Sequence, residues 1–548
     1  TPYTIHGVNS SLRSLKVRRL SIKLEKAVAG ISLGIRRITI SKSDKEALPP
    51  WTKLKKDELF PLIDRYGQFI HKEWPGKTSS DEDLIAAREK EEAELAKLTG
   101  SADWCQFGGY KAGEQYTATG AFYVKKINGK WWMIDPDGHL FWSHGLVRVG
   151  PSGAITSLGN RKYLFSDLPD PQSSFGEFYK TRDESLYPYF QARGMNETFD
   201  FSAANLKRKY GENWRTAFAD IVHRRLRSWG MNTISATSDK MIYLQNRTPY
   251  CDRLDPASPV IDGIPEGLAR MRDPFHADFV NKLKELLLSR KDELSSSWCV
   301  GYWVDNKISW GNGTDLARWV LKSSGTQPSK ITLLSILKKK YNKIDNLDTA
   351  WGTDYKQWEQ LLMNRSDAPP GAEADLKDFT TLLIGKYFSE IQNALKEIAP
   401  GKLYMGCKFN SINPDVLAIA AKYADVLSFD LFVDSLSGFR LPAGIDKPVF
   451  IGEFHFGATD RGLFNPGLNE TENQEQRGAA YYTYVSSALK NPLIVGTSWH
   501  QYSDQSTVGR FDGEDFQDGM TDVCDHVYPE TIEKVREVGY RMYQLRLE

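Results

Sequence analysis

The sequence predicts an α/β protein, a (β/α)8 TIM barrel with a small all-β accessory region at its N-terminus. Three observations support this prediction. The 548 residues exceed the roughly 250 of a minimal barrel. Beyond residue 120, short apolar runs alternate with amphipathic segments, as in parallel β/α proteins. Residues 13–42 instead alternate apolar and polar positions, which is typical of short strands joined by turns.

We expect three regions along the chain. Residues 1–48 are predicted to form two or three strands, interpreted as the remnant of a β-sandwich carbohydrate-binding module. Residues 49–119 are predicted to be a linker and helical segment that packs on the barrel, with a charged helix over 81–98. Residues 120–548 are predicted to form the barrel itself.

The barrel strands follow in order along the last region. Seven are apolar runs, and the third strand is expected around 248–254. A doubly wound open sheet is the alternative, but no Gly-rich phosphate turn follows any strand. The seven runs are 139–150, 230–237, 299–306, 403–409, 424–432, 448–454 and 493–499. The helices are expected over 205–229, 274–290, 330–341, 373–398, 470–490 and 529–545.

Composition excludes several classes of partner. The 71 Lys and Arg residues balance 70 Asp and Glu residues, so no overall field attracts nucleic acid or a charged membrane. No run of about 20 apolar residues predicts a membrane span. Fifteen Trp residues favour stacking on sugar rings only weakly, because aromatic side chains mostly fill cores. The five Cys residues lack metal-ligand spacing, and neither a metal nor a cofactor is expected.

The chain begins at Thr1 instead of Met, which suggests that a leader was removed or the chain was trimmed. We therefore expect a secreted or periplasmic protein. The sequence leaves its oligomeric state open.

Functional side chains of a barrel lie at the carboxyl ends of its strands. Glu453 ends the apolar run PVFIGEF, so its carboxylate is expected to project into the mouth of the barrel. The alternative is a buried structural carboxylate held by Arg or by backbone amides. The other polar or aromatic residues at strand ends are His144, Arg148, Asp305, Asn306, Lys307, Lys408, Asn410, Asp430, His455, Trp499, His500 and Gln501.

Two of these strand ends resemble a known group. Gly-Glu-Phe on the seventh strand, with Trp ending the eighth, is similar to clan A glycoside hydrolases, which implies that Glu453 is the nucleophile and that Trp499 floors the sugar subsite. The segment CVGYWVDNKISWGN (299–312) resembles the GY(F/W)VDNE(x)SW segment of β-agarases, glycoside hydrolase family fifty. Lys307 stands where that family has its acid/base Glu. Further similar segments are 130–150, 338–362 and 498–525, so the resemblance covers roughly 50–548.

The resemblance implies retaining hydrolysis of β-linked, agarose-type galactan chains or oligosaccharides, without a cofactor. It also implies that Asn306 binds the sugar 2-hydroxyl; a structural cap is the alternative. The three His residues come from separate strands without a recognisable metal pattern, and 512–522 lacks the spacing of a calcium loop. The other expected sugar contacts, each with core packing or structural hydrogen bonding as its alternative, are His144, Arg148, His455, Trp499, His500, Gln501, Trp310, Lys408 and Asp305.

Lys307 changes the expected mechanism. A retaining glycosidase needs two carboxyl groups about 5–5.5 Å apart. An ammonium beside Glu453 should have its pKa held high, which makes it a poor acid and no base, while Glu453 stays ionised. Four interpretations remain open. The chain hydrolyses glycosides with a replacement acid (Asp305, His455 or a carboxylate in 498–525); it is a lapsed barrel that binds galactan; Lys307 is an engineered inactivation; or Lys307 pairs with a sulfate or carboxylate on an anionic sugar.

Overall fold

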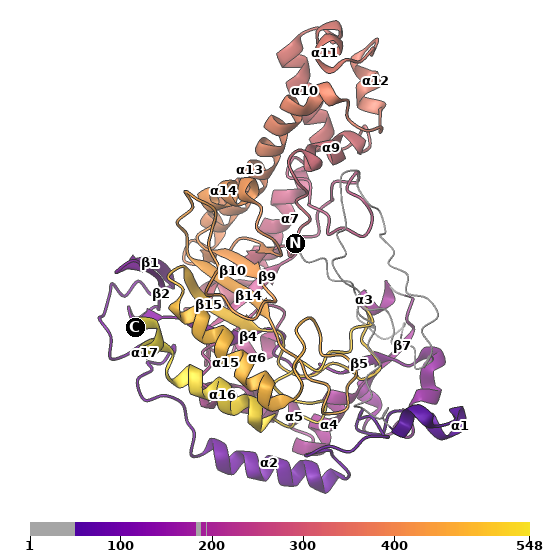
Figure 1. The fold of residues 1–548 in the computed structure, drawn as a ribbon, viewed down its shortest axis with the longest axis vertical. Helices are drawn as coiled ribbons and strands as arrows, with labels where there is room; N and C mark the ends of the chain where they lie inside the picture. Colours follow the sequence, from indigo (N-terminus) through magenta and orange to yellow (C-terminus); the bar gives the residue numbers. More distant parts are fainter. Residues whose placement is uncertain (1–49, 182–187, 193) are drawn as a thin grey trace, which may run out of the picture.

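The computed structural model describes residues 50–181, 188–192 and 194–548. The strands predicted over 1–48 lie outside these residues. Figure 1 shows a body built around a sheet and a helical arm that projects from it along the long axis of the molecule.

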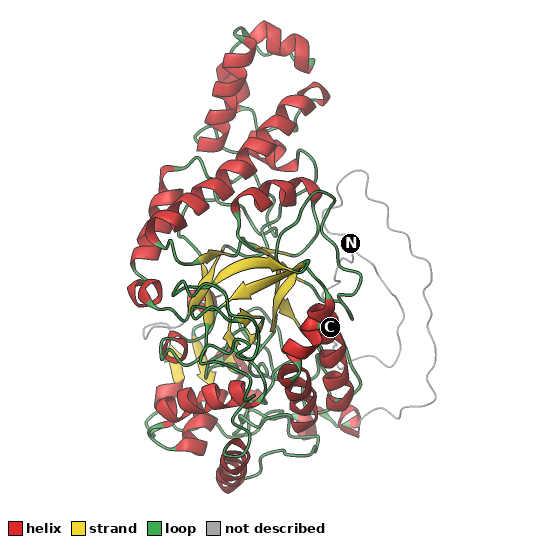
Figure 2. Ribbon diagram, turned by 90° about the vertical axis from the view of Figure 1, so that its left-hand side faces the viewer, coloured by secondary structure: helices red, strands yellow, loops and turns green. Residues whose placement is uncertain are grey.

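The centre of the body is one curled, parallel, nine-stranded sheet with helices around it (Figure 2). Its order is β11-β10-β9-β8-β4-β15-β14-β13-β12. The predicted strand positions are confirmed, because each expected run contains a strand of this sheet. The strands are β4 (Ser143–Leu146), β8 (Thr233–Ile234), β9 (Tyr250–Leu254), β10 (Cys299–Val304), β11 (Leu403–Tyr404), β12 (Lys408–Phe409), β13 (Leu427–Asp430), β14 (Val449–Phe454) and β15 (Ile494–Trp499).

The two outermost strands of the sheet, β11 and β12, are separated in the chain by residues 405–407 alone. β10 pairs with β11, and just beyond it the backbone N–H of Lys307 donates to the carbonyl of Lys408, the first residue of β12 (3.0 Å). The edges of the sheet therefore lie next to each other in the chain and share the neighbour β10.

Apolar strands explain why the sheet is buried. Every residue of β10, β14 and β15 is buried, as expected for parallel strands covered on both faces. One apolar cluster draws on several strands and includes Trp303, Met405, Phe450 and Val495. A larger cluster joins the strands to the surrounding helices.

The predicted helix over 205–229 is two helices, because Gly211 ends the first one at a φ of 73°. Gly tolerates that conformation, which would strain any other residue type. The helices of the body are α1 (Lys56–Leu59), α2 (Asp81–Leu95), α3 (Pro188–Gln191), α4 (Phe201–Tyr210), α5 (Trp214–Ser228), α6 (Lys240–Tyr243), α7 (Ala277–Leu288), α8 (Lys291–Ser295), α14 (Pro414–Tyr423), α15 (Gln474–Lys490), α16 (Pro529–Tyr540) and α17 (Met542–Leu547).

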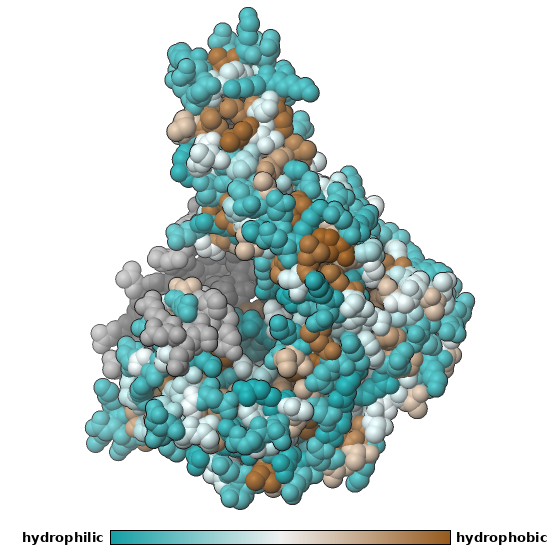
Figure 3. Space-filling view, turned by 180° about the vertical axis from the view of Figure 1, so that it is seen from behind, coloured by the Kyte–Doolittle hydropathy of each residue, from teal (hydrophilic) through white to brown (hydrophobic). Residues whose placement is uncertain are grey.

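The arm follows β10 in the chain, and α13 runs from it back to the body (Figure 1). Viewed from behind, the surface of the molecule is mostly hydrophilic, with apolar side chains in small groups on the arm and the body (Figure 3). No helix in the described ranges has both the length and the apolar character to span a bilayer. The helices of the arm are α9 (Asp315–Lys322), α10 (Pro328–Tyr341), α11 (Ile344–Trp351), α12 (Trp358–Met363) and α13 (Glu373–Ile398).

Two small antiparallel sheets flank the central one. One has the order β1-β2-β3, and β3 leads directly into β4. The other has the order β5-β7-β6. Their strands are β1 (Tyr123–Ile127), β2 (Lys130–Ile134), β3 (Leu140–Phe141), β5 (Ile155–Ser157), β6 (Tyr179–Thr181) and β7 (Glu197–Asp200).

Candidate active site

The carboxyl ends of neighbouring strands carry an unusual backbone. Arg148 follows β4 with a φ of 53°, Thr237 follows β8 with 61°, and Asp305 and Lys307 follow β10 with 62° and 53°. Residues other than Gly seldom adopt this left-handed conformation, and a β-branched Thr does so least readily. Such strain persists where the surrounding structure imposes it, often at functional sites. These strand ends therefore mark the candidate site, called the mouth below.

Glu453, at the end of β14, lies between two ammonium groups in the mouth. Its Oε2 accepts a hydrogen bond from Nζ of Lys307 (2.7 Å), and its Oε1 accepts one from Nζ of Lys408 (2.8 Å). A second carboxylate, Asp430 at the end of β13, lies 3.2 Å from Nζ of Lys307. The expected approach of Lys307 to Glu453 is therefore found, and Lys408 and Asp430 complete the cluster.

Charge pairing sets the protonation of this cluster. Burial alone would raise the pKa of Glu453, but Lys307 and Lys408 outweigh it and hold that pKa well below its usual range. Burial alone would lower the pKa of Lys307, yet Glu453 and Asp430 raise it. Burial and the charge of Glu453 raise the pKa of Asp430 to about 6. At neutral pH the site thus holds an ionised Glu453 and a protonated Lys307.

Asp518 holds two histidines beside the cluster. Nδ1 of His500 donates to Oδ2 of Asp518 (2.8 Å), since a carboxylate only accepts. Nε2 of His455 accepts the N–H of Leu468 (2.7 Å), so its Nδ1 carries the proton and lies 3.4 Å from Asp518. Burial lowers the pKa of His455 to about 4. His455 is therefore neutral and committed to its neighbours.

The same tautomer argument bears on metal binding in the mouth. Ligand atoms of His455, His500 and Asp518 lie within 4.8 Å of one another. A metal needs a lone pair on each imidazole, but Nδ1 of His455 carries a proton and its Nε2 already accepts from Leu468. These residues do not fit a metal while those bonds are in place.

Arg148 lines a cavity of about 260 Å³ together with Gln501, Thr237 and Arg510. Arg510 is paired with Asp512. The half-buried guanidinium of Arg148, in contrast, has no hydrogen bond or ion pair with any residue that the structure describes. Burial and the charge of Arg510 lower the pKa of Arg148. A half-buried cation that faces a cavity and has no partner in the described ranges is suited to bind an acceptor group of a ligand.

The structure assigns different surroundings to two further predicted residues after β10. Asp305 is engaged by Arg272 (2.6 Å) and by the hydroxyl of Tyr387 (2.8 Å), so both carboxylate oxygens have donors. Asn306 is half-buried, and its Oδ1 has no hydrogen-bond partner within the described ranges. Asn306 therefore keeps a free acceptor next to Lys307, whereas Asp305 is bound into the fold.

Three predicted residues lie in the core instead of the mouth. His144 is fully buried; its Nδ1 donates to the carbonyl of Gly230 (2.8 Å) and its Nε2 accepts from the hydroxyl of Tyr481 (2.5 Å). Trp499 is fully buried, and its indole N–H donates to the carbonyl of Asp518. Trp310 is buried and stacks on Phe388. None of these three side chains is placed to contact a sugar directly. Core packing and structural hydrogen bonds account for their positions.

Two acidic residues of the mouth were only partly anticipated: Asp430 was expected at a strand end without a role, and Asp518 only as one of the carboxylates in 498–525. Asp430 ends the run ADVLSFDLF in the same way as Glu453 ends its run, so its position in a strand was available as a signal. Asp518 lies in a loop after β15, and no local pattern distinguishes it from the neighbouring acidic residues.

No family model matches the chain. Two curated proteins of Vibrio sp. (strain JT0107) are similar to it. β-Agarase B is 31% identical over 533 residues, covering 88% of this chain and 55% of that protein. β-Agarase A is 30% identical over 527 residues, covering 88% and 52%. The chain is thus homologous to proteins named β-agarase and spans about half of their length.

Solved structures agree in fold. The crystal structure of an agarase superposes with a TM-score of 0.82 at 28% identity, covering 90% of this chain and 74% of that one. The structure of an exo-β-agarase superposes with a TM-score of 0.82 at 29% identity, with the same coverage.

Proposed function

We propose that this chain is a glycoside hydrolase of the β-agarase type, acting on β-linked, agarose-type galactan chains or oligosaccharides. The observation that carries the proposal is Glu453: a buried carboxylate, kept ionised at the carboxyl edge of the sheet, in a chain homologous to β-agarases over 88% of its length. Because such polysaccharides do not cross a membrane intact, we also propose that the protein works outside the cytoplasm.

We infer that the curled sheet is a closed (β/α)8 barrel of clan A. With β11 and β12 taken as two parts of one strand, the sheet has eight strands, and the N–H of Lys307 joins β10 to β12 (3.0 Å). The barrel spans 120–548, and 49–119 packs on it. Figure 1 supports this division, with α2 lying beneath α4 and α5.

In the proposed retaining mechanism Glu453 attacks the anomeric carbon and forms a glycosyl-enzyme intermediate, which water then hydrolyses. A second group must protonate the leaving oxygen and later deprotonate the water. Lys307 stands at that position but stays protonated beside Glu453 and Asp430. Its contribution is electrostatic, and the proton must come from elsewhere.

His500 is the best-placed candidate for that proton transfer. Its Nδ1 is fixed by Asp518, and its Nε2 has no hydrogen-bond partner among the described residues. Its backbone N–H donates to the carbonyl of Phe454, the residue after Glu453 (2.9 Å), so the two groups share the mouth. The other candidates already have hydrogen-bond partners. Arg272 and Tyr387 donate to the carboxylate of Asp305, and the N–H of Leu468 donates to Nε2 of His455.

We propose Arg148, Gln501 and Asn306 as the sugar-binding side chains. Arg148 and Gln501 line the cavity of about 260 Å³, and Asn306 offers a free carbonyl oxygen beside Lys307. This volume is at the small end for a ligand site, which favours recognition of a short segment of a longer chain.

The deciding experiment is Lys307→Glu, assayed on agarose oligosaccharides and on an aryl β-galactoside. Restoring the carboxylate pair should raise kcat by about 10²- to 10⁴-fold, the usual contribution of general acid–base catalysis. Lys307→Gln is the control, because it removes the ammonium without supplying an acid. Added Glu453→Gln should abolish all turnover. A fall in rate in Lys307→Glu would show instead that Lys307 has its own catalytic role.

A non-catalytic galactan-binding protein is the second candidate. It is favoured by the two lysines that neutralise both oxygens of Glu453, an arrangement that suits a stable binding surface. In that case the unmodified chain should bind agarose oligosaccharides measurably without cleaving them, and Glu453→Gln should leave affinity within a few fold. Turnover that disappears in Glu453→Gln would exclude this candidate.

A further inference from the structure

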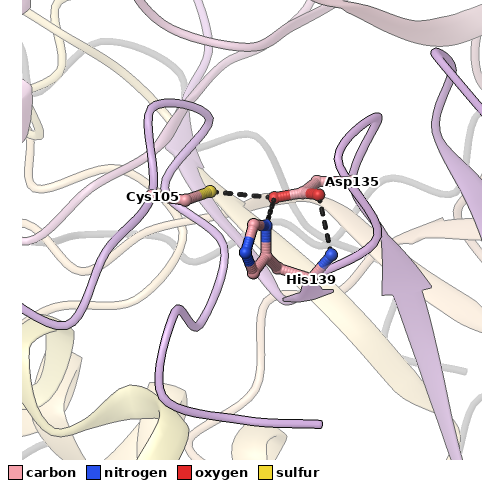
Figure 4. Close-up of side chains that lie close together, drawn as sticks. All are labelled: Cys105, Asp135 and His139. Carbon is pink, nitrogen blue, oxygen red and sulfur yellow. Dashed lines mark hydrogen bonds and ion pairs between the residues drawn. The ribbon is translucent and has the colours of Figure 1, made fainter. Parts of the chain in front are cut away.

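A second cluster of reactive side chains lies away from the mouth. Figure 4 shows Cys105, Asp135 and His139 pointing toward one another. Asp135 follows β2 and His139 precedes β3, on the hairpin that leads into the amino end of β4. The mouth lies at the opposite, carboxyl end of that strand, so this cluster is separate from the proposed catalytic groups.

The two carboxylate oxygens of Asp135 have different partners. Its Oδ1 accepts the backbone N–H groups of Asp137 (3.0 Å) and His139 (2.8 Å), which fixes the turn. Its Oδ2 instead faces two side chains, with Sγ of Cys105 at 2.9 Å and Nδ1 of His139 at 3.4 Å (Figure 4). One sulfur, one nitrogen and one oxygen thus lie within 4.8 Å of one another.

The charge at Asp135 is unbalanced. Its side chain is fully buried, yet no Lys or Arg in the described part of the chain lies within ion-pair distance of it. Buried carboxylates are ordinarily paired with a cation or bound to a metal. Nδ1 of His139 is likewise buried without a hydrogen-bond partner there. Both observations point to a cation between these atoms.

The neighbouring backbone packs closely on the cluster. A Cβ added to Gly109 would lie 2.3 Å from Oδ2 of Asp135, so only Gly fits there without displacing the carboxylate. A backbone hydrogen bond from Cys105 to Gly109 closes the loop that carries Cys105, and one from Tyr110 to Leu140 holds this loop against the hairpin. The three ligand atoms therefore come from two segments that are already positioned.

We propose that Cys105, Asp135 and His139 form a zinc-binding site. Thiolate, imidazole and carboxylate are the ligands that Zn²⁺ takes in proteins, whereas Ca²⁺ and Mg²⁺ prefer oxygen alone. Three protein ligands leave the fourth tetrahedral position to water. Because the site lies at the amino end of the barrel and clamps a loop to a hairpin, it acts on stability and not on turnover.

Binding requires the loss of one proton. In the metal-free protein, Sγ of Cys105 donates its proton in a hydrogen bond to Oδ2 of Asp135 (2.9 Å). Zn²⁺ replaces the thiol proton with a metal–sulfur bond, and the proton leaves to solvent. Affinity should therefore fall as the pH is lowered.

The test uses the full chain, stripped with a chelator and then titrated with Zn²⁺ or Co²⁺. We expect one equivalent of zinc by elemental analysis, a rise in Tm, and a thiolate-to-cobalt charge-transfer absorption in the Co²⁺ form. Cys105→Ser should remove that absorption and weaken zinc binding at least tenfold, and His139→Gln should weaken it similarly. Cys251→Ala, at another buried cysteine, should retain the absorption.

Two results would overturn the proposal. One is wild-type protein that takes up no stoichiometric zinc and has the same Tm with and without it, which would leave the cluster as a hydrogen-bonded turn. The other is a cobalt charge-transfer absorption that persists in Cys105→Ser. The wild-type cobalt spectrum decides by itself if that variant does not fold.

Discussion

At the scale of single residues, the balance of positive and negative side chains in the mouth sets protonation and binding there. Three cations, Lys307, Lys408 and Arg148, act on the two carboxylates Glu453 and Asp430. The third carboxylate, Asp518, is engaged by His455 and His500. A retaining glycosidase with two carboxyl groups would have the opposite balance at its centre. This excess of positive charge is the basis for the first two predictions.

Lys408 is expected to set the acid limit of catalysis. Burial raises the pKa of Glu453, and the ammonium of Lys408 lowers it. Lys408→Met removes that ammonium, so the pKa of Glu453 should rise. In a Lys307→Glu background, adding Lys408→Met should move the acidic limb of the kcat/KM profile to higher pH. The measurement is a pH series on an aryl β-galactoside. An unmoved limb would mean that Glu453 does not govern it.

Arg148 is expected to favour an anionic sugar. Because its guanidinium has no carboxylate partner in the described ranges, a sulfate or carboxylate on the substrate would supply one. Arg148→Met should weaken binding of a sulfated galactan oligosaccharide about tenfold or more, and that of its neutral counterpart much less. Calorimetric titration with the matched pair measures the difference. Equal losses for both would restrict Arg148 to neutral sugar contacts.

His144 is expected to stabilise the fold without touching substrate. His144→Leu leaves the carbonyl of Gly230 and the hydroxyl of Tyr481 without partners, which costs about 2–4 kcal/mol of unfolding free energy at pH 7. Sugar affinity should be unchanged. Urea unfolding and a binding assay on the same samples test both parts, and weakened binding by a fully folded variant would contradict the assignment.

The unfolding free energy that His144→Leu removes should depend on pH in a definite direction. Burial lowers the pKa of His144 to about 4, against about 6.5 in an unfolded chain. Above pH 6.5 His144 is neutral in both states, and its contribution to the unfolding free energy is fully present. As the pH falls from 6.5 toward 4, only the unfolded chain takes up the proton, so up to about 3 kcal/mol of unfolding free energy is lost. The gap between wild type and His144→Leu should accordingly narrow in acid.

At the scale of elements, neighbouring strands approach most closely where one of them has no side chain. A Cβ on Gly145 would lie 2.3 Å from the carbonyl oxygen of Thr233, and one on Gly301 would lie 2.2 Å from that of Leu403. Gly385, inside α13, is different, because its nearest neighbours would be at 4.0 Å. The same substitution should therefore have opposite effects at these positions.

Gly301→Ala should destabilise the protein by about 1–3 kcal/mol, because the added methyl group forces β10 away from β11. Gly385→Ala should instead stabilise it by about 0.5–1 kcal/mol, since Ala is the better helix former and has room. Chemical unfolding of both variants beside wild type measures the two signs. A neutral Gly301→Ala would show that the strands can separate without loss.

Strand positions could be predicted because an apolar run needs burial on both faces, and β9 was expected even where its run, 248–254, is mixed. The break at Gly211 was missed, since a Gly within a helical pattern is often tolerated. Which strand-end side chains meet depends on contacts between distant segments. Periodicity could not show that Trp499 faces the core while His500, its neighbour, faces the mouth.

At the scale of the whole molecule, a buried ionic network joins α2 to α4, α5 and the loop after β15. Arg225 in α5 is fully buried and contacts Glu91 of α2 (2.6 Å) and Asp525 in the loop after β15 (2.5 Å). Lys209 of α4 also contacts Asp525 (2.9 Å). Segments from both ends of the described chain therefore depend on one set of charges.

Asp525→Asn is expected to lower the unfolding free energy by about 3–5 kcal/mol, because two buried cations lose a charged partner. Glu285→Gln, which removes the exposed pair with Lys282, should leave the unfolding free energy nearly unchanged and is the matched control. Thermal and urea unfolding of both variants provide the comparison. Similar small losses would mean that the network does not hold α2 in place.

The Lys307 position also has a genetic consequence. The codons AAA and AAG for lysine differ from GAA and GAG for glutamate at the first base alone. The backbone there already places a side chain against Glu453 at 2.7 Å, so exchanging the two residue types requires no new fold. A single transition mutation thus separates the two charge states of this mouth, and a lineage carrying this fold can pass between them in one step.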